Sequence, residues 1–161
     1  MAGVVKCTCV LAMTKSRHSL DCAISEFALG KLSYSDLPNV ACDALELGFD
    51  GPAIRRLASL QKPSYFGVGD LFEKALKEIG IEQWSKRDAA VFLAKEIGRD
   101  ILAGRKEPLA AAEEIWGLCV AAGYPKELVT FGGLDREFDI PELIEECRIL
   151  VAEPQRTYFP E

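Results

Sequence analysis

Hydrophobic residues recur every three to four positions along most of the chain, and glycines interrupt this pattern at intervals. In residues 16–30, for example, Leu20, Ile24 and Phe27 lie on one helical stripe that stops at Gly30. Such a period, closed by a glycine, is typical of an amphipathic helix. The pattern therefore predicts an all-α fold, a compact bundle of seven to eight helices. The predicted helices cover 16–30, 35–48, 50–60, 69–80, 85–104, 107–123, 125–134 and 139–151.

The first fifteen residues depart from this helical pattern, because polar and β-branched positions alternate there. Alternation of this kind favours a strand or an irregular segment over a helix. We therefore expect three parts: a strand-like or disordered N-terminal extension over 1–15, a single helical domain over 16–153 and a C-terminal tail over 154–161. The tail carries two aromatic residues, which either pack back on the domain or dock on a partner.

Residues 28–60 and residues 101–134 share a similar sequence pattern, an internal repeat. In both stretches a helix ends at a glycine and a basic residue, the next helix ends at a glycine and an aromatic residue, and a short helix begins near a proline. One interpretation is duplication of a three-helix unit, which would leave a pocket between two pseudo-repeated units. The other is that unrelated helical hairpins converge on glycine stops. The sequence leaves both interpretations open.

Most of the net charge of −6 lies in the last fifth of the chain, which contains eight acidic residues and only three arginines. An acidic balance argues against general binding to nucleic acid or to anionic membranes, since both require clustered basic residues. No apolar run approaches the length that a membrane-spanning helix needs, and no basic leader precedes the first apolar stretch. We therefore expect a cytoplasmic protein whose six cysteines are reduced thiols.

The N-terminal cysteines and the single histidine are the candidate for metal chemistry. Cys7 and Cys9 would share one face of a strand, and His18 and Cys22 would share one face of a helix. Together they supply four nitrogen and sulfur ligands, the donor set that zinc prefers. The C-x-C spacing is nevertheless shorter than the usual spacing of structural zinc sites. A zinc site, a redox pair and incidental cysteines are therefore the alternatives.

Other catalytic constellations are missing from the sequence. A single histidine excludes the repeated Glu-x-x-His pattern of carboxylate-bridged di-iron sites, and no G-x-S-x-G motif is present. We therefore expect a non-enzymatic protein with no cofactor; a small-molecule or metal-binding protein with a pocket between the pseudo-repeats is the alternative. A DNA-binding regulator is a further alternative, based on Arg55, Arg56 and Lys62. These arginines are expected to pair with acidic neighbours instead.

A protein partner agrees best with the charge and aromatic patterns. Aromatic residues lie largely at predicted helix ends, where most should pack in the core and some should anchor a partner. They are Tyr34, Phe49, Tyr65, Phe66, Trp84, Trp116, Tyr124, Phe131, Phe138, Tyr158 and Phe159. An acidic surface would also speed association with a basic partner. The acidic residues predicted to bind protein are Asp135, Glu137, Asp139, Glu142, Glu145 and Glu146.

Two segments carry a family resemblance, LGKLSYSDLPNVACDALELGFDGPAIRRLASL at 29–60 and AAEEIWGLCVAAGYPKELVTFGGLDREFD at 111–139. They resemble a type of small bacterial helical protein with no assigned activity, in which similar G-[KR]-[IL], LP and GYP-x-x-L motifs open and close the domain. The resemblance implies a bacterial all-α domain and carries over no catalytic residue. At the level of class, the chain is also similar to immunity proteins of bacterial toxin systems, which neutralise a toxin by covering it. The oligomeric state is left open.

Overall fold

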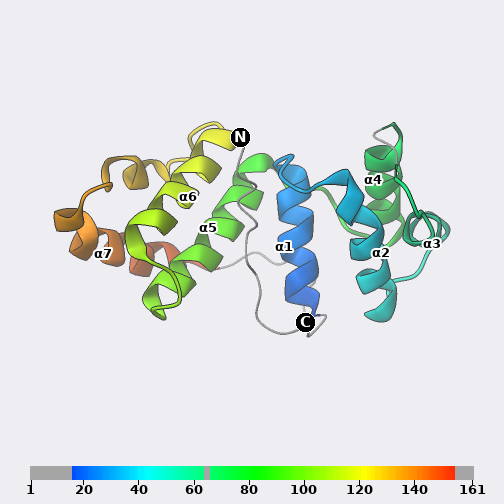
Figure 1. Ribbon diagram of the computed structural model, residues 1–161, viewed down its shortest axis with the longest axis horizontal. Coiled ribbons are helices and arrows are strands. Elements are labelled where there is room, and N and C mark those ends of the chain that lie inside the picture. Colours follow the sequence, from blue (N-terminus) through cyan, green and yellow to red (C-terminus); the bar gives the residue numbers. More distant parts are fainter. Residues whose placement is uncertain (1–15, 64–65, 155–161) are drawn as a thin grey trace.

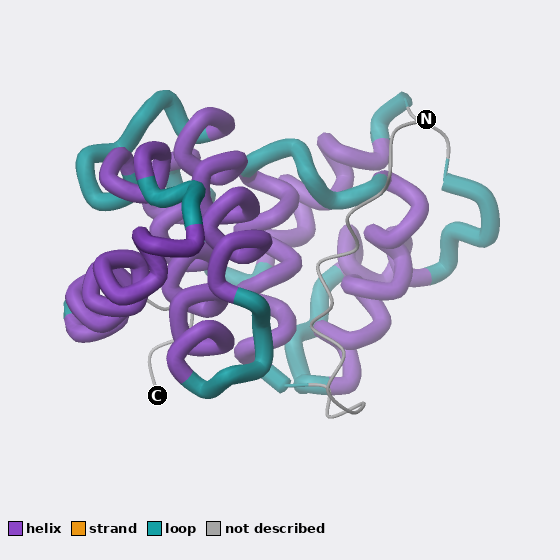
Figure 2. Tube along the Cα trace, turned by 60° about the vertical axis from the view of Figure 1, so that its left-hand side comes forward, coloured by secondary structure: helices purple, strands orange, loops and turns teal. Residues whose placement is uncertain are grey.

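The computed structural model describes residues 16–63 and 66–154, in which every regular element is helical (Figure 1; Figure 2). The expected all-α bundle is confirmed, with seven α-helices in these residues, and the predicted helix over 125–134 is only a short 3-10 helix. The predicted extension over 1–15 and the tail beyond Pro154 lie outside the described residues. The elements are α1 (Arg17–Ala28), η1 (Tyr34–Asp36), α2 (Leu37–Glu46), α3 (Pro52–Ala58), α4 (Val68–Glu78), α5 (Lys86–Leu102), α6 (Pro108–Ala121), η2 (Val129–Gly133), η3 (Glu137–Asp139) and α7 (Ile140–Ala152).

Most helices end in the same hydrogen-bonded turn, which explains the regular glycine stops. At the end of α2, the Gly48 N–H donates to the Leu45 carbonyl and the Phe49 N–H donates to the Ala44 carbonyl, both at 3.0 Å. This Schellman turn places the glycine in the left-handed region, where a side chain would be strained. Four further helices, α1, α4, α5 and α6, close in the same way. Helix α4 lies outside the internal repeat and still ends in this turn. The shared glycine turns therefore do not distinguish duplication from convergence.

Helix α1 contributes to two hydrophobic cores and so joins two halves of the molecule. Its Leu20 and Ile24 pack with α2, α3 and α4, whereas its Cys22 packs with α5, α6 and α7. Figure 1 shows α1 standing between these two groups of helices. We call α1–α4 the N-terminal half and α5–α7 the C-terminal half.

The closing helix packs differently in each half. Helix α7 lies along α5, so closely that a Cβ on Gly98 would be 3.2 Å from Val151 Cγ2 and 3.8 Å from Cys147 Cβ. Helix α4 packs instead on α3, and α1 packs against α5 of the other half. The same order of elements is therefore assembled in two different ways.

Candidate functional site

The acidic residues predicted to bind protein gather on α7 and on the turn before it. Glu142, Glu145 and Glu146 are spaced three and four residues apart, so they share one face of α7. The buried Leu143, Cys147 and Leu150 form a separate face that packs inward. Ile149 continues the acidic face and is 54% exposed. Arg148 of the same helix is exposed and donates to the Glu145 carboxylate at 2.9 Å. The outer face of α7 therefore carries three glutamates, one of them paired with an arginine, and one exposed apolar residue.

Upstream of α7, part of the predicted acidic set serves the local backbone. Asp139 accepts a hydrogen bond from the Arg136 N–H at 3.0 Å, and the Asp135 carboxylate lies 3.9 Å from the Arg136 guanidinium. Glu137 and Glu142 are exposed and form no hydrogen bond or ion pair with the residues that the structure describes. The structure thus brings the six residues to one end of the molecule, with Asp139 in a structural role.

An aromatic pair lies at the end of α6, beside this acidic face. The rings of Trp116 and Tyr124 have centroids 5.8 Å apart, and Val120 lies one helical turn beyond Trp116. Val120 and Tyr124 are 46% and 58% exposed. The backbone of Gly132 in η2 lies against the Trp116 ring, and a Cβ on this glycine would be only 2.5 Å from the ring. The position of Trp116 therefore depends on a glycine at 132.

Tyr124 has an unusual backbone conformation that holds its ring at the surface. Its φ of 61° lies in the left-handed region, which no other non-glycine residue in the described ranges adopts. This region costs a residue with a side chain about 1–2 kcal/mol, and such a cost is characteristic of functional sites. The Tyr124 N–H completes the turn by donating to the Cys119 carbonyl at 2.9 Å.

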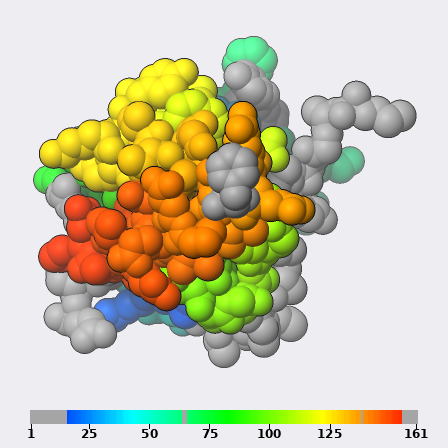
Figure 3. All heavy atoms as spheres, turned by 90° about the vertical axis from the view of Figure 1, so that its left-hand side faces the viewer, coloured from blue at the N-terminus to red at the C-terminus, as the bar shows by residue number. Residues whose placement is uncertain are grey.

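A hydrogen bond between η2 and α7 connects the aromatic pair with the acidic face. The Thr130 hydroxyl donates to the Glu146 carboxylate at 3.2 Å. Figure 3 looks onto this end of the molecule, where the yellow segment around residue 120 lies next to the orange and red residues of η3 and α7. We call this region the end surface; it consists of Trp116, Val120, Tyr124, Glu142, Glu145 and Glu146.

The structure brings together only two members of the predicted metal set. His18 Nε2 lies 3.9 Å from Cys22 Sγ on the same face of α1, and 2.8 Å from the Glu96 carboxylate of α5. Cys7 and Cys9 lie outside the described residues. Within the described part of the chain, no three histidine, cysteine, aspartate or glutamate side chains are placed to hold a metal ion. The four-ligand zinc site remains a prediction.

The described cysteines are free thiols, and most of them are buried. Cys22, Cys119 and Cys147 are buried, whereas Cys42 is exposed. Burial raises the pKa of the Cys147 thiol to about 11 and also raises the pKa of Cys119. Because the thiolate is the reactive form, these two thiols are poor nucleophiles at neutral pH.

Of the three basic residues behind the DNA-binding alternative, Arg55 is paired with an acidic neighbour. Arg55 makes a two-pronged ion pair with Asp50, in which Nε donates to Oδ1 at 2.6 Å, and this hydrogen bond lowers the pKa of Asp50. Arg56 and Lys62 are exposed. The expected pairing with an acidic neighbour is therefore confirmed for Arg55.

Two cavities offer space for small molecules. One is a groove of about 470 Å³ where α1 ends, between the N-terminal half and the segment before α5, with Tyr34 and Trp84 in its lining. The other, of about 130 Å³, lies in the C-terminal half beside the buried Lys95. Sequence reasoning gave Lys95 no role, although a lysine between Ala94 and Ile97 in the apolar stripe was an available signal.

Neither the fold nor similarity to known proteins assigns this chain to a family. No helix of the described residues is long and apolar enough to cross a membrane. Comparisons with protein-family models, with curated proteins and with solved structures give no match to this chain. The findings therefore support a small all-helical protein and identify no family.

Proposed function

We propose that the chain is a non-enzymatic binding module that holds a basic protein on its end surface. The observation that carries this proposal is the exposed Tyr124 ring on the half-buried Trp116, fixed by Gly132 and by the left-handed backbone of Tyr124, beside the glutamates of α7. Aromatic anchors at an apolar centre with charged residues around them are typical of interface hot spots. The glutamates favour a basic partner and would speed its association.

An immunity-type inhibitor is the concrete form of this proposal. Such a protein would place the end surface over a basic cleft of a toxin and block access to it. The resemblance to small bacterial helical proteins and the expected cytoplasmic location belong to the same proposal. The free thiols of the four described cysteines agree with a reducing compartment.

The test is capture of a partner from a lysate of the native host by the wild type and by two variants of the end surface. Tyr124→Gly removes the ring and relieves the backbone strain, so the fold should be unharmed. The double variant Glu142→Lys, Glu145→Lys reverses the charge of α7. A matched control, Glu73→Lys with Glu82→Lys, makes the same charge change on exposed residues of α4 and of the segment that follows it.

We expect one stoichiometric basic protein that binds the wild type and the control equally. Both end-surface variants should bind it at least about tenfold more weakly, since a hot-spot side chain contributes about 2 kcal/mol or more. Failure to recover a stoichiometric partner, or equal binding to Tyr124→Gly and to the wild type, would contradict the proposal.

A further inference from the structure

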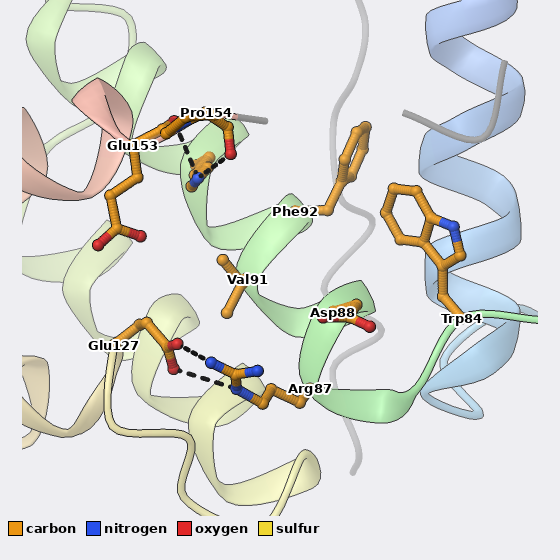
Figure 4. A pocket seen from close by; sticks show the side chains of 9 residues that line it. Trp84, Arg87, Asp88, Val91, Phe92, Glu127, Glu153 and Pro154 are labelled. Atoms are coloured by element: carbon orange, nitrogen blue, oxygen red, sulfur yellow. Dashed lines mark hydrogen bonds and ion pairs between the residues drawn. The ribbon is translucent and has the colours of Figure 1, made fainter. Parts of the chain in front are cut away.

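The cavity in the C-terminal half has the size of a small aromatic molecule. Its volume of about 130 Å³ is close to the roughly 150 Å³ of an apolar cavity that accepts benzene. Figure 4 shows the aromatic rings of Trp84 and Phe92 on one side of it, with Val91 between them and the opposite wall. Trp84 and Phe92 meet edge to face at 5.4 Å, and both are buried. One side of the cavity is therefore rigid, apolar and aromatic.

A buried ammonium supplies the polar group of the cavity. Lys95 is 3% exposed, and its Nζ donates to the backbone carbonyls of Glu153 at 3.1 Å and Pro154 at 3.2 Å, where α7 ends. An ammonium has three N–H donors, so one remains for the cavity that Lys95 lines. Among the described residues no carboxylate forms an ion pair with Lys95, and burial lowers its pKa. The charges of Glu153 and Glu127 oppose this shift without forming an ion pair with the ammonium. A buried cation without an ion-pair partner is stabilised by an anionic ligand.

The carboxylates near the cavity are already engaged or face water. Glu127 is held by Arg87, which donates to it through both Nε and Nη2. The Asp88 carboxylate accepts a hydrogen bond from the Ser85 hydroxyl at 2.9 Å. Glu153 is exposed, so solvent and salt screen its charge. The ammonium of Lys95 is therefore the buried cation that lines the cavity without an ion-pair partner among the described residues.

We propose that this cavity binds a small aromatic carboxylate of about the size of benzoate. The carboxylate would accept the remaining N–H of Lys95, and the ring would lie against Val91, Phe92 and Trp84. A charge-assisted hydrogen bond fixes the orientation, and the aromatic wall selects a flat ring. This site uses none of the residues of the end surface, so the proposed ligand can be tested independently of the proposed protein partner.

The test is calorimetric titration of the protein with benzoate and with benzamide, its neutral counterpart. We expect saturable benzoate binding with a dissociation constant in the millimolar range or below, and benzamide binding that is at least about tenfold weaker. Lys95→Met keeps the apolar stem without the ammonium and should lose at least about tenfold in benzoate affinity. The control Lys106→Met removes an ammonium that pairs with Glu114 at 2.6 Å outside the cavity, and should bind as the wild type does.

A second variant keeps the test valid if Lys95→Met fails to fold. Val91→Phe fills the cavity from a half-buried position and leaves Lys95 in place, so it should also abolish benzoate binding. Circular dichroism establishes that each variant is folded. The proposal is overturned if benzoate does not saturate, if benzamide binds equally well, or if a folded Lys95→Met or Val91→Phe variant keeps the wild-type affinity.

Discussion

The two halves of the molecule run through the same order of elements, two helices, a short helix and a closing helix, yet they bury and expose different chemistry. The N-terminal half buries the polar side chains of Asp21 and Ser25 on α1, whereas the C-terminal half buries the ammonium of Lys95 and the thiols of Cys119 and Cys147. Exposed large apolar residues are also more frequent in the C-terminal half of the described chain. In the described chain, the buried cation and most of the exposed large apolar residues therefore lie in the C-terminal half, while the pattern that forms helices is common to both.

The largest expected effect tests whether the halves are one cooperative unit. Leu57 and Leu143 are fully buried, one in each core. Leu57→Ala and Leu143→Ala should each lower the free energy of unfolding by about 2–5 kcal/mol. Because α1 belongs to both cores, we expect one unfolding transition for the whole molecule.

Urea unfolding with two probes measures this cooperativity directly. Both tryptophans pack with the C-terminal core, whereas circular dichroism reports all helices. Leu57→Ala should therefore shift the fluorescence midpoint as much as the circular-dichroism midpoint, although the substitution lies in the other half. A fluorescence midpoint that stays at the wild-type value would show that the halves unfold separately.

The second prediction concerns alkaline pH and the thiol of Cys147, whose pKa rises from 9.0 to about 11 in the folded state. Between these values the unfolded chain loses the proton first, so stability present below pH 9 is lost as the pH approaches 11. The loss is at most about 1.4 kcal/mol per pH unit. Lys95 acts in the opposite direction, because its lowered pKa makes the unfolded chain hold the extra proton.

Urea unfolding across this pH range separates the contribution of Cys147. Cys147→Ala should flatten the fall of the unfolding free energy between pH 9 and 11, whatever its effect at neutral pH. Cys42→Ala is the control, because that thiol is exposed in the N-terminal half. Identical slopes for Cys147→Ala and the wild type would contradict the buried-thiol explanation.

The third prediction tests the support beneath the aromatic pair. Gly132→Ala places a Cβ against the Trp116 ring, which must move, so the unfolding free energy should fall by about 1–3 kcal/mol. Gly133→Ala is a closely matched control, because a Cβ at that neighbouring position meets nothing within 4 Å. Trp116 fluorescence should change in the first variant alone. Equal stability of the two variants would mean that Gly132 does not position the ring.

The helices could be predicted from the sequence because their signals are local. A stripe of apolar residues and a glycine in the Schellman turn lie within a few positions of each other, so Gly48 and Gly123 predict two helix ends directly. The acidic face of α7 was predictable for the same reason. The surroundings of Lys95 were not, because its carbonyl partners lie 58 and 59 residues away. The contact between Gly132 and Trp116 likewise depends on how η2 meets α6.

The smallest expected effect contrasts a distant helix cap with a local one. In the N-terminal half, the Glu78 carboxylate of α4 accepts the Ala53 N–H of α3 at 2.8 Å. In the C-terminal half, Glu107 caps its own helix α6 by accepting the Leu109 and Ala110 N–H groups. Those backbone hydrogen bonds lower the pKa of Glu107, so its contribution is present above pH 4.5 and is lost as the pH falls through the lowered pKa.

Removing each cap should speed amide hydrogen exchange in a different part of the molecule. Glu78→Ala should cost about 1 kcal/mol of unfolding free energy and speed hydrogen exchange at Ala53, because α4 then no longer holds the start of α3. Glu107→Ala should speed hydrogen exchange only at Leu109 and Ala110. It should also reduce the fall of the unfolding free energy at acid pH. Glu82 is exposed and forms no hydrogen bond or ion pair with the described residues, so Glu82→Ala should change neither. If the Ala53 amide exchanges no faster in Glu78→Ala, the start of α3 is held by its apolar packing alone. The cap from α4 would then not be a stabilising difference between the N-terminal and C-terminal halves.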